Sequence, residues 1–206
     1  MSNVSRAQTT ALACLLPAIP VISELGRLFA DAGHQLYLVG GSLRDALLGV
    51  QGHDLDFTTS ARPDQTQRLL NQFTDTVWDV GREFGTISAQ AFRSEHEWLI
   101  EITTFRTDSY RKTSRKPDVA FGDRVEDDLL RRDFTVNAMA LDIGSGDPGD
   151  WRFVDPFGGL DDLASCILRT PSTPEISFGD DPLRMMRAAR FSSQLNFEVD
   201  PVCRKA

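Results

Sequence analysis

The sequence predicts an α/β (α+β) fold in which a mixed β-sheet with flanking helices is followed by an all-α segment. Short β-rich runs alternate with helical patterns through residues 17–150, and the hydrophobic pattern becomes helical after residue 160. A Gly/Asp turn at 145–149 separates the two parts. We therefore expect one domain at 17–150 and the truncated start of an all-α domain at 151–206.

The elements of the first part are predicted from the spacing of apolar residues and from glycines that end helices or form turns. Residues 17–33 predict an amphipathic helix, because apolar residues recur at three- and four-residue spacing and Gly33 supplies a stop. The elements that follow are a strand at 35–39, a helix at 42–48, a strand at 53–59, a helix at 64–73, and strands at 77–80, 85–92 and 98–105.

The second half of the chain begins with a segment that lacks periodicity. Residues 107–122 carry Lys, Arg, Ser, Pro and Gly, which predicts a mobile loop long enough to be functional. The expected elements after this loop are a helix at 125–130, a strand at 137–143 and a strong helix at 180–191.

Composition argues against a disordered, collagen-like or low-complexity chain. The 206 residues are 41% hydrophobic and 25% charged, which is typical of a globular chain with a buried core. The formal net charge of -8 argues against nucleic-acid binding through bulk charge and leaves only local basic patches, such as residues 106–116.

Cysteine usage and apolar runs favour a cytoplasmic protein. The three cysteines are widely spaced without a Cys-x-x-Cys, so neither a disulfide framework nor a structural zinc site is expected. The apolar run at 11–22 is broken by Pro17 and Pro20 and is too short to span a bilayer. We expect no membrane association and no signal peptide.

Asp54 and Asp56 lie two residues apart on a predicted strand, so both side chains project from one face. Carboxylate oxygens suit hard cations such as Mg²⁺, which can activate an attacking hydroxyl and stabilise a leaving phosphate. A solvated strand face explains the same pattern, and the neighbouring motif adds weight to the metal site.

That motif is Gly40-Gly41, which follows a predicted strand and opens the helix that carries Arg44. The free N–H groups at a helix start suit a phosphate, and Arg44 would add a charge-assisted contact. Taken alone, two glycines are better explained by a tight strand-to-helix turn. The short spacing to Asp54, however, would bring phosphate and metal together.

Charged residues in apolar surroundings mark further candidates. Glu101 interrupts an apolar strand, so it either pairs with a buried arginine or joins Asp54 and Asp56 in a carboxylate cluster. Arg131 and Arg132 suit phosphate contacts. The alternative, in which Asp133 pairs with one arginine to cap a helix end, is compatible with that role.

A stripe of charge recurs every third residue in the C-terminal helix. On a helical projection Asp181, Arg184 and Arg187 lie opposite an apolar arc, as expected of an amphipathic helix. The apolar arc comprises Leu183, Met186 and Ala189. Arg190 falls on that arc, which predicts a buried stem with an ion-paired head. For Asp181 and Arg184 the simple alternative is a surface pair.

Together these motifs resemble those of bacterial-type (class II) tRNA nucleotidyltransferases, the family of CCA-adding enzymes and poly(A) polymerases. The matching segments, in the same order, are residues 40–45, 54–56, 131–139 and 181–191. Two departures are small: Asp180-Asp181 stands where the family often has Glu-Asp, and Pro182 replaces a more usual Ala.

The resemblance implies a nucleotidyltransferase head at 17–150 followed by the start of a helical neck, and roles for individual residues. Asp54, Asp56 and Glu101 would be catalytic, with Asp54 and Asp56 as the Mg²⁺ ligands. The implied nucleotide-binding residues are Gly40, Gly41, Ser42, Arg44, Arg132, Asn137, Asp181, Arg184, Arg187 and Arg190. The loop at 107–122 matches the family's flexible loop, which is linked to switching from C to A.

Asp181 and Arg184 resemble the pair that hydrogen-bonds the Watson–Crick edge of the incoming base. A carboxylate accepts from an exocyclic amino group and a guanidinium donates to a ring nitrogen or carbonyl, so the pair can distinguish C and A from G and U.

The implied activity is template-independent addition of CCA to the 3′ end of tRNA from CTP and ATP, with Mg²⁺ and release of pyrophosphate. The alternatives are a poly(A) polymerase, an enzyme that adds only CC or only A, and a catalytically idle nucleotide-binding fragment. We expect tRNA, CTP and ATP as partners, with weak tRNA affinity for this chain. No feature predicts the oligomeric state.

Overall fold

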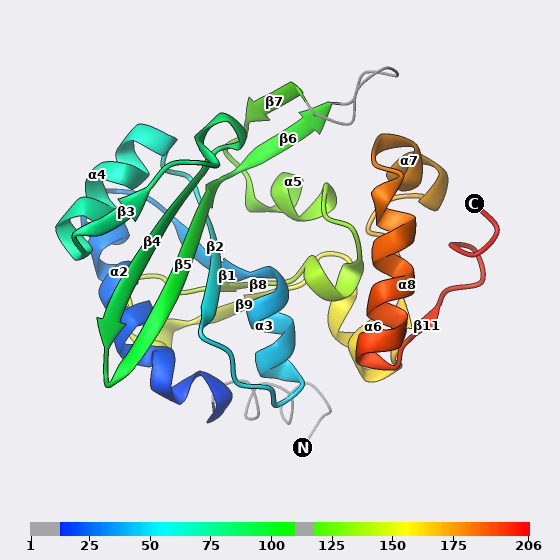
Figure 1. Cartoon of the computed structure of the whole chain (residues 1–206), viewed down its shortest axis with the longest axis horizontal. Helices are drawn as coiled ribbons and strands as arrows, with labels where there is room; N and C mark the ends of the chain where they lie inside the picture. Colours follow the sequence, from blue (N-terminus) through cyan, green and yellow to red (C-terminus); the bar gives the residue numbers. More distant parts are fainter. Residues whose placement is uncertain (1–12, 110–117) are drawn as a thin grey trace.

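The computed structural model describes residues 13–109 and 118–206 and contains a seven-stranded mixed sheet (Figure 1). The strand order is β3-β4-β5-β2-β1-β8-β9, and only the central pair β2-β5 is parallel. The strands are β1 (Leu36–Val39), β2 (Asp54–Thr59), β3 (Thr76–Trp78), β4 (Thr86–Arg93), β5 (His96–Thr104), β8 (Ala140–Asp142) and β9 (Arg152–Val154). The predicted mixed α/β architecture is confirmed.

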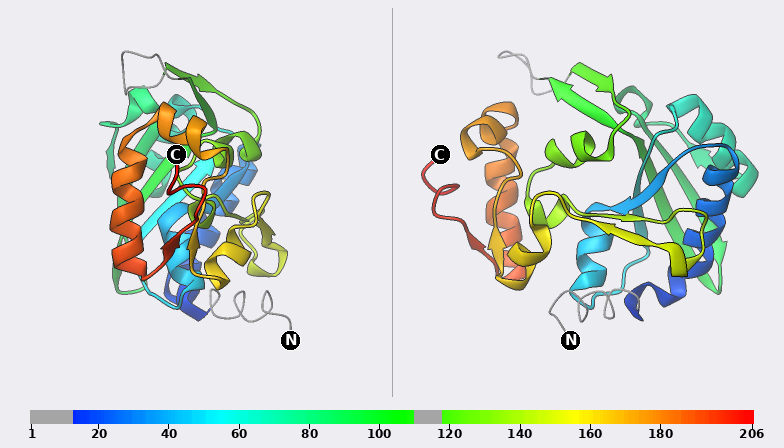
Figure 2. Two further views of the ribbon diagram at one scale, coloured as in Figure 1. Left: turned by 90° about the vertical axis from the view of Figure 1, so that its right-hand side faces the viewer. Right: turned by 180° about the vertical axis from the view of Figure 1, so that it is seen from behind.

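Helices cover the sheet and its end. Helices α2 (Ile19–Asp31) and α4 (Pro63–Phe73) pack on one side, and α3 (Gly40–Leu47) follows β1 directly. The helices α6 (Gly159–Ala164), α7 (Pro174–Asp180) and α8 (Leu183–Leu195) come last, and α7 and α8 stand at the opposite side of the molecule from α2 and α4 (Figures 1 and 2). Helix α5 (Val125–Leu130) and the 3-10 helices Leu16–Ala18, Arg82–Phe84, Thr135–Asn137 and Pro148–Asp150 complete the described elements.

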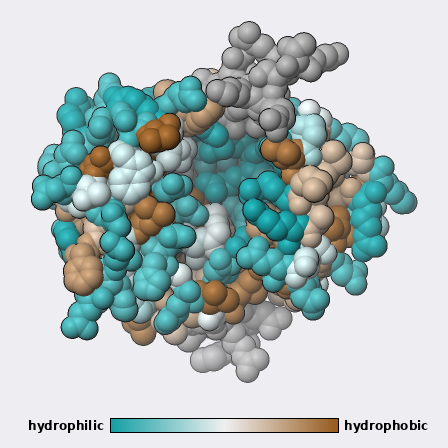
Figure 3. All heavy atoms as spheres, viewed as in Figure 1, coloured by the Kyte–Doolittle hydropathy of each residue, from teal (hydrophilic) through white to brown (hydrophobic). Residues whose placement is uncertain are grey.

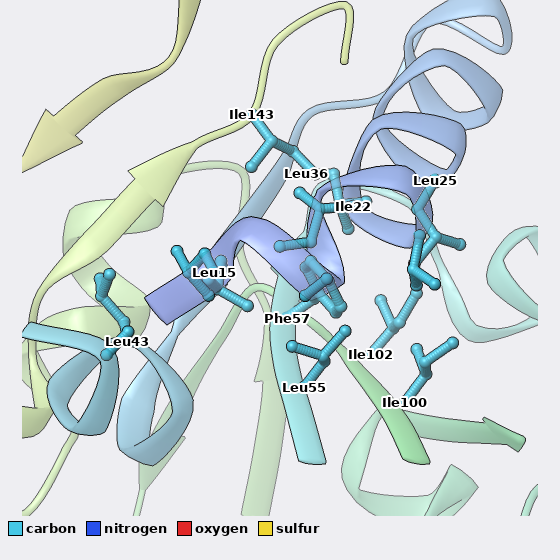
Figure 4. Packing of buried hydrophobic residues seen from close by; sticks show 14 of the residues in the cluster. Leu15, Ile22, Leu25, Leu36, Leu43, Leu55, Phe57, Ile100, Ile102 and Ile143 are labelled. Atoms are coloured by element: carbon cyan, nitrogen blue, oxygen red, sulfur yellow. The ribbon is translucent and has the colours of Figure 1, made fainter. Parts of the chain in front are cut away.

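The core forms where the apolar face of α2 meets the sheet (Figure 4). Ile22 and Leu25 of α2 lie against Leu55 and Phe57 of β2, and all four are at most 2% exposed. Burying each such side chain contributes about 1.5–3 kcal/mol. Because side chains alternate along a strand, burial of Leu55 and Phe57 turns the aspartates of β2 to the other face.

Among the described residues, one helical stretch, from Ala13 to Asp31, is long and apolar enough to cross a membrane by length and composition alone. Core helices of soluble proteins share this length and composition. Here Val21, Ile22, Leu25 and Phe29 are 0% exposed, as expected of a helix that packs on a sheet.

Part of the predicted loop at 107–122 is a hairpin. Strands β6 (Arg106–Ser109) and β7 (Asp118–Phe121) pair antiparallel and form a separate two-stranded sheet. Thr107, Ala120 and Phe121 are all exposed, so these positions carry no apolar alternation that would mark a strand in the sequence. Residues 110–117 of the predicted mobile loop lie outside the described residues.

The segment predicted as a strand at 137–143 begins differently. Thr135–Asn137 form a 3-10 helix, in which the Asn137 N–H donates to the Phe134 carbonyl at 2.9 Å, and β8 starts only at Ala140. Asn137 therefore lies in a tight turn, where both polar ends of its side chain can point into the protein.

The division of the chain after residue 150 also differs from the expectation. Strand β9 pairs with β8, so the sheet extends to Val154. The C-terminal part is not purely α-helical, because β10 (Ile167–Leu168) and β11 (Glu198–Val199) form a short parallel pair. Two residues per strand are too few to give an alternating pattern in the sequence.

The helix predicted at 180–191 is α8, which begins at Leu183 and follows a separate helix, α7. Helix α7 ends at Asp180, Asp181 is extended with φ −138° and ψ 99°, and Pro182 precedes the first residue of α8. The predicted packing face is also wrong. Arg184, Ala188 and Phe191 are buried, whereas Leu183 and Met186 are 48% and 69% exposed. The packing face differs because α8 covers hydrogen-bond acceptors. These acceptors are Ser177, the Arg131 carbonyl and Asp133, and they bind Arg184 and Arg187.

Candidate active site

A cavity of about 830 Å³ lies between the open end of the sheet and α8. Figure 3 shows it as a hollow lined with hydrophilic residues near the middle of that face. Every sequence-predicted site residue lines it except Asp54 and Ser42. The predicted residues that line this central cleft are Gly40, Gly41, Arg44, Asp56, Glu101, Arg132, Asn137, Asp181, Arg184, Arg187 and Arg190.

Asp54 and Ser42 line a neighbouring cavity of about 190 Å³, and Gly41 and Asp56 line both cavities. The Ser42 hydroxyl donates to the Val39 carbonyl at 2.9 Å and accepts from the Asp56 N–H at 3.1 Å. Ser42 therefore ties the glycine turn to β2. Its hydroxyl shapes the site rather than facing the central cleft.

The carboxylates at the sheet end share one face. Asp56 is the register partner of Glu101 across the parallel pair β2-β5, and Ser88 Oγ donates to Glu101 Oε1 at 3.5 Å. Burial raises the pKa of Asp56; Arg132 opposes this shift, and the negative charges of Glu101 and Asp54 add to it. The repulsion indicates a local excess of negative charge.

Asp54, Asp56 and Glu101 do not form the predicted cluster of three carboxylates around one metal position. Within residues 13–109 and 118–206, no group of three or more His, Cys, Asp or Glu side chains is arranged to hold a metal ion. Asp54 and Asp56 remain a pair of oxygen donors on one strand face, with Glu101 on the adjacent strand. The buried arginine considered as a partner for Glu101 is replaced by Ser88.

The glycine turn requires glycine for two reasons. Gly40 has φ +68°, a conformation that side chains with a Cβ rarely adopt. A Cβ at Gly40 would also lie 3.1 Å from Arg132 Nη1 and 3.4 Å from Asp56 Oδ2. The turn thus lets an arginine and a carboxylate of the cleft approach the backbone at the start of α3.

Asp128 holds the two arginines of the Arg131-Arg132 pair. Its side chain is 0% exposed, and its Oδ1 accepts from Arg131 Nη2 at 2.7 Å while its Oδ2 accepts from Arg132 Nη2 at 3.1 Å. Burial alone raises the pKa of Asp128, but both arginines outweigh burial and the net pKa is lowered. The predicted partner, Asp133, is therefore corrected to Asp128, which precedes the arginines by three and four residues.

Asp133 instead links α3 to α8. Its Oδ1 accepts from Asn137 Nδ2 at 3.0 Å, and its Oδ2 accepts from Arg187 Nε at 2.7 Å. Asn137 Oδ1 in turn accepts from Arg44 Nη1 at 2.7 Å. This buried chain orients Arg44 and Arg187 from opposite sides of the cleft.

Arg184 is anchored from two directions. Nη1 donates to Ser177 Oγ at 2.7 Å and Nη2 to the Arg131 carbonyl at 2.6 Å. Asp181 uses Oδ1 to accept from the Leu183 N–H at 3.0 Å. The surface pair considered for Asp181 and Arg184 is therefore wrong, since Arg184 is only 7% exposed and has other partners.

Phe191 provides an aromatic floor that the sequence reasoning missed. The guanidinium carbons of Arg44, Arg187 and Arg190 lie 5.2, 5.3 and 4.8 Å from its ring centroid. The predicted buried stem of Arg190 is wrong, because Arg190 is exposed and lies over this ring. An aromatic residue at the end of an arginine repeat could have signalled the stacking.

Other lining residues were also missed. Phe84, Thr86 and Thr103 come from the sheet region, and Arg106, which donates to the Phe84 carbonyl, comes from β6. Arg106 belongs to the basic patch seen in the sequence, but nothing in the sequence placed that patch beside the cleft.

Comparison with known proteins identifies a family. A family model described as "Poly A polymerase head domain" matches residues 36–169. The CCA-adding enzyme of Ligilactobacillus salivarius is 42% identical over 184 residues, which are 89% of this chain and 41% of that protein.

Solved structures agree in fold. The chain is similar to the Bacillus stearothermophilus CCA-adding enzyme in complex with CTP, at TM-score 0.73 and 34% identity over 92% of this chain and 42% of that one. It is also similar to the Thermotoga maritima CCA-adding enzyme complexed with tRNA, at TM-score 0.69 and 29% identity over 90% of this chain and 40% of that one. The chain thus spans about two fifths of these relatives.

Proposed function

Because this chain belongs to the poly(A) polymerase head-domain family, we propose that it carries the nucleotidyl-transfer site of an enzyme that adds CCA to the 3′ end of tRNA. The substrates are CTP, ATP and tRNA, and pyrophosphate is released. One observation carries this proposal: a single cleft joins carboxylates on β2 and β5 to arginines on α8 and on the turn after α5. The head extends through β9, and the neck begins with α6.

We propose Mg²⁺ as the cofactor, held by Asp54 and Asp56. The family is generally dependent on divalent metals. The donor set fits, since both residues supply oxygens from one strand face and Asp56 lies among repelling carboxylates. Mg²⁺ commonly takes one or two carboxylates and completes its shell with water and phosphate oxygens, so a third side chain is not required. When bound, Mg²⁺ would lower the pKa of the attacking hydroxyl and neutralise negative charge on the leaving group.

The phosphate end of the site is the start of α3. The N–H groups of Gly40, Gly41 and Ser42 bind phosphate oxygens, and Arg132, whose Nη1 lies near Gly40, adds a charge-assisted contact. Arg44 lies under this turn with its guanidinium oriented by Asn137 and Asp45. Asp128 keeps Arg132 pointed at the same place.

The base end of the site is formed by α8 and the residue before it. Asp181 accepts from the exocyclic amino group of C or A, and Arg184 donates to the adjacent ring nitrogen. G and U present a carbonyl and an N–H in these positions and are rejected. Arg187 and Arg190 add positive charge to this side of the cleft and stack on Phe191.

In the reaction, the 3′-hydroxyl oxygen of the tRNA attacks the α-phosphorus of the nucleotide. The hydroxyl loses its proton to solvent as the new phosphodiester bond forms. The bond from the α-phosphorus to the oxygen that bridges to the β-phosphate breaks, and pyrophosphate leaves with that electron pair. Glu101, beside Asp56, contributes negative charge near the attacking hydroxyl. We place this activity in the cytoplasm, because Cys14, Cys166 and Cys203 are all free.

A second candidate is a catalytically idle nucleotide-binding fragment. The observation that favours it is charge, since a formal net charge of -8 opposes binding of the tRNA phosphates. In that case the cleft binds nucleotide, but the chain does not bind tRNA tightly enough to extend it.

The test is incubation of the chain with Mg²⁺, labelled CTP or ATP, and a tRNA transcript that ends at the discriminator base. A sequencing gel then reads product length and base identity. Ordered addition of C, C and A supports the proposal. Bound nucleotide without extension supports the idle fragment, and a long A tail would favour a poly(A) polymerase.

A further inference from the structure

Both members of the proposed base-reading pair depend on one buried serine. Ser177 lies in α7, is 0% exposed, and accepts from Arg184 Nη1 through its hydroxyl at 2.7 Å. Its backbone carbonyl accepts from the Asp181 N–H at 3.3 Å. The same residue therefore contacts Arg184 through its side chain and Asp181 through its backbone.

The position of Ser177 is itself fixed by α7. Its N–H donates to the Thr173 carbonyl at 3.0 Å in the first turn of that helix. The Ser177 hydroxyl lies in the buried interior and not in the central cleft, so it cannot touch a nucleotide directly. Its effect on a ligand must pass through Arg184.

The hydrogen bond limits which way Arg184 can point. Two of the five guanidinium N–H groups are used, one by Ser177 and one by the Arg131 carbonyl at 2.6 Å. Both acceptors belong to separate elements, so the guanidinium plane is fixed at two points. The remaining N–H groups then keep one direction relative to Asp181.

We propose that Ser177 is a positioning residue for base selection, which sets the orientation of Arg184 so that nucleotides with an amino group beside a ring acceptor are preferred. This inference rests on the proposed base-reading role of Asp181 and Arg184. Selecting C and A over G and U requires an N–H aimed at a ring nitrogen, and a rotated guanidinium would also donate to a carbonyl there.

The phosphate end of the cleft does not share this contact. Arg132 is held by Asp128, and the start of α3 is tied to β2 through Ser42. Loss of the Ser177 hydroxyl therefore changes base preference and leaves triphosphate binding unchanged.

The experiment compares wild type with Ser177→Ala and with Ser23→Ala, a matched loss of a buried helical hydroxyl in α2. Isothermal titration gives the Kd for CTP, ATP, UTP, GTP and inorganic tripolyphosphate with Mg²⁺. We expect the preference for CTP and ATP to fall about tenfold in Ser177→Ala, the scale of one hydrogen bond to a charged group. Tripolyphosphate affinity should be unchanged, and Ser23→Ala should match wild type throughout.

A double-mutant cycle separates positioning from a general structural role. In an Arg184→Ala background, Ser177→Ala should have no further effect on base preference, because the hydroxyl acts only through Arg184. Additive effects, or a parallel loss of tripolyphosphate binding in Ser177→Ala, would overturn the inference.

The control nucleotides also distinguish this inference from the proposed function. If wild type shows no preference for CTP and ATP over UTP and GTP, the base-reading role fails and the role of Ser177 fails with it. A selective wild type with an equally selective Ser177→Ala overturns the Ser177 inference alone.

Discussion

Two aspartates, Asp56 at the carboxylate end of the cleft and Asp128 behind its arginines, are held in opposite ways although both lie near Arg132. Asp56 lies on β2 beside Glu101 and Asp54, and its pKa is raised because burial, together with these like charges, outweighs the attraction of Arg132. Asp128 is buried behind α5 between two arginines, and its pKa is lowered because their attraction outweighs burial. The charge of Asp56 is therefore only partly compensated, by Arg132, whereas the charge of Asp128 is fully compensated by two arginines.

The difference shows how each end prepares for a nucleotide. At the carboxylate end, crowded negative charge favours a bound cation. At the arginine end, Asp128 and Asp133 fix the guanidinium groups before any ligand arrives, so little ordering remains to be done on binding.

The largest expected effect concerns the carboxylate end. Asp54→Ala combined with Asp56→Ala should lower nucleotide incorporation about 10³-fold or more, because both proposed Mg²⁺ ligands are removed. Single-turnover incorporation of labelled CMP into tRNA measures it. Glu97→Ala on β5 is the control, since Glu97 contacts Gln90 away from the cleft. Undiminished incorporation at saturating Mg²⁺ would remove both aspartates from the mechanism.

The next effect concerns the arginine end. Asp128→Ala should lower the free energy of unfolding by about 3–5 kcal/mol, because it leaves two arginines near a buried site without their acceptor. Urea denaturation followed by circular dichroism measures it. Asp127→Ala, in the same helix turn, should change stability by less than about 0.5 kcal/mol. Equal stability of the two variants would show that Asp128 does not stabilise the fold by binding Arg131 and Arg132.

Asn137→Ala tests the link between the two sides. The variant leaves Arg44 Nη1 and Asp133 Oδ1 without the amide that joins them, which should cost about 1–3 kcal/mol of stability. The exposed Asn71 of α4 gives a matched control when replaced by Ala. If both variants unfold at the same denaturant concentration, the chain through Asn137 does not stabilise the site.

The smallest expected effect is a pH dependence of opposite sign at the two ends. A lowered pKa means that Asp128 contributes stability above about pH 3.8 and loses it as the pH falls through the folded-state pKa. The deficit of Asp128→Asn should therefore shrink in acid.

Asp56 has a raised pKa, so its ionised form costs stability at neutral pH and the cost disappears below about pH 3.8. Asp56→Asn without metal should be slightly more stable than wild type at pH 7 and equal to it in acid. Thermal unfolding across this range checks both signs, and parallel pH profiles of the two variants would contradict the comparison.

The carboxylate end was more predictable from sequence than the arginine end. Period-two alternation places Asp54 and Asp56 opposite Leu55 and Phe57, and the structure confirms that shared face. Strand alternation depends only on local backbone geometry, so it could be read without knowing the neighbours.

The arginine end depends on what lies beneath each helix. A projection of α8 turns its charges to solvent, whereas Ser177, Asp133 and the Arg131 carbonyl draw Arg184 and Arg187 inward. Asp128 lies in an acidic helix turn with Glu126 and Asp127, and the sequence does not single it out from them. Only the tertiary structure brings these acceptors under the arginines, and no periodicity in the sequence encodes that.

The most direct test of the central claim, that the carboxylate end requires a cation to act on a nucleotide, is isothermal titration of CTP with and without Mg²⁺. Wild type and Asp56→Asn are compared at one pH and ionic strength. We predict that Mg²⁺ tightens CTP binding to wild type by about tenfold or more and that Asp56→Asn loses most of this gain. An equal gain in both proteins would contradict the account, because Mg²⁺ would then act on the nucleotide alone.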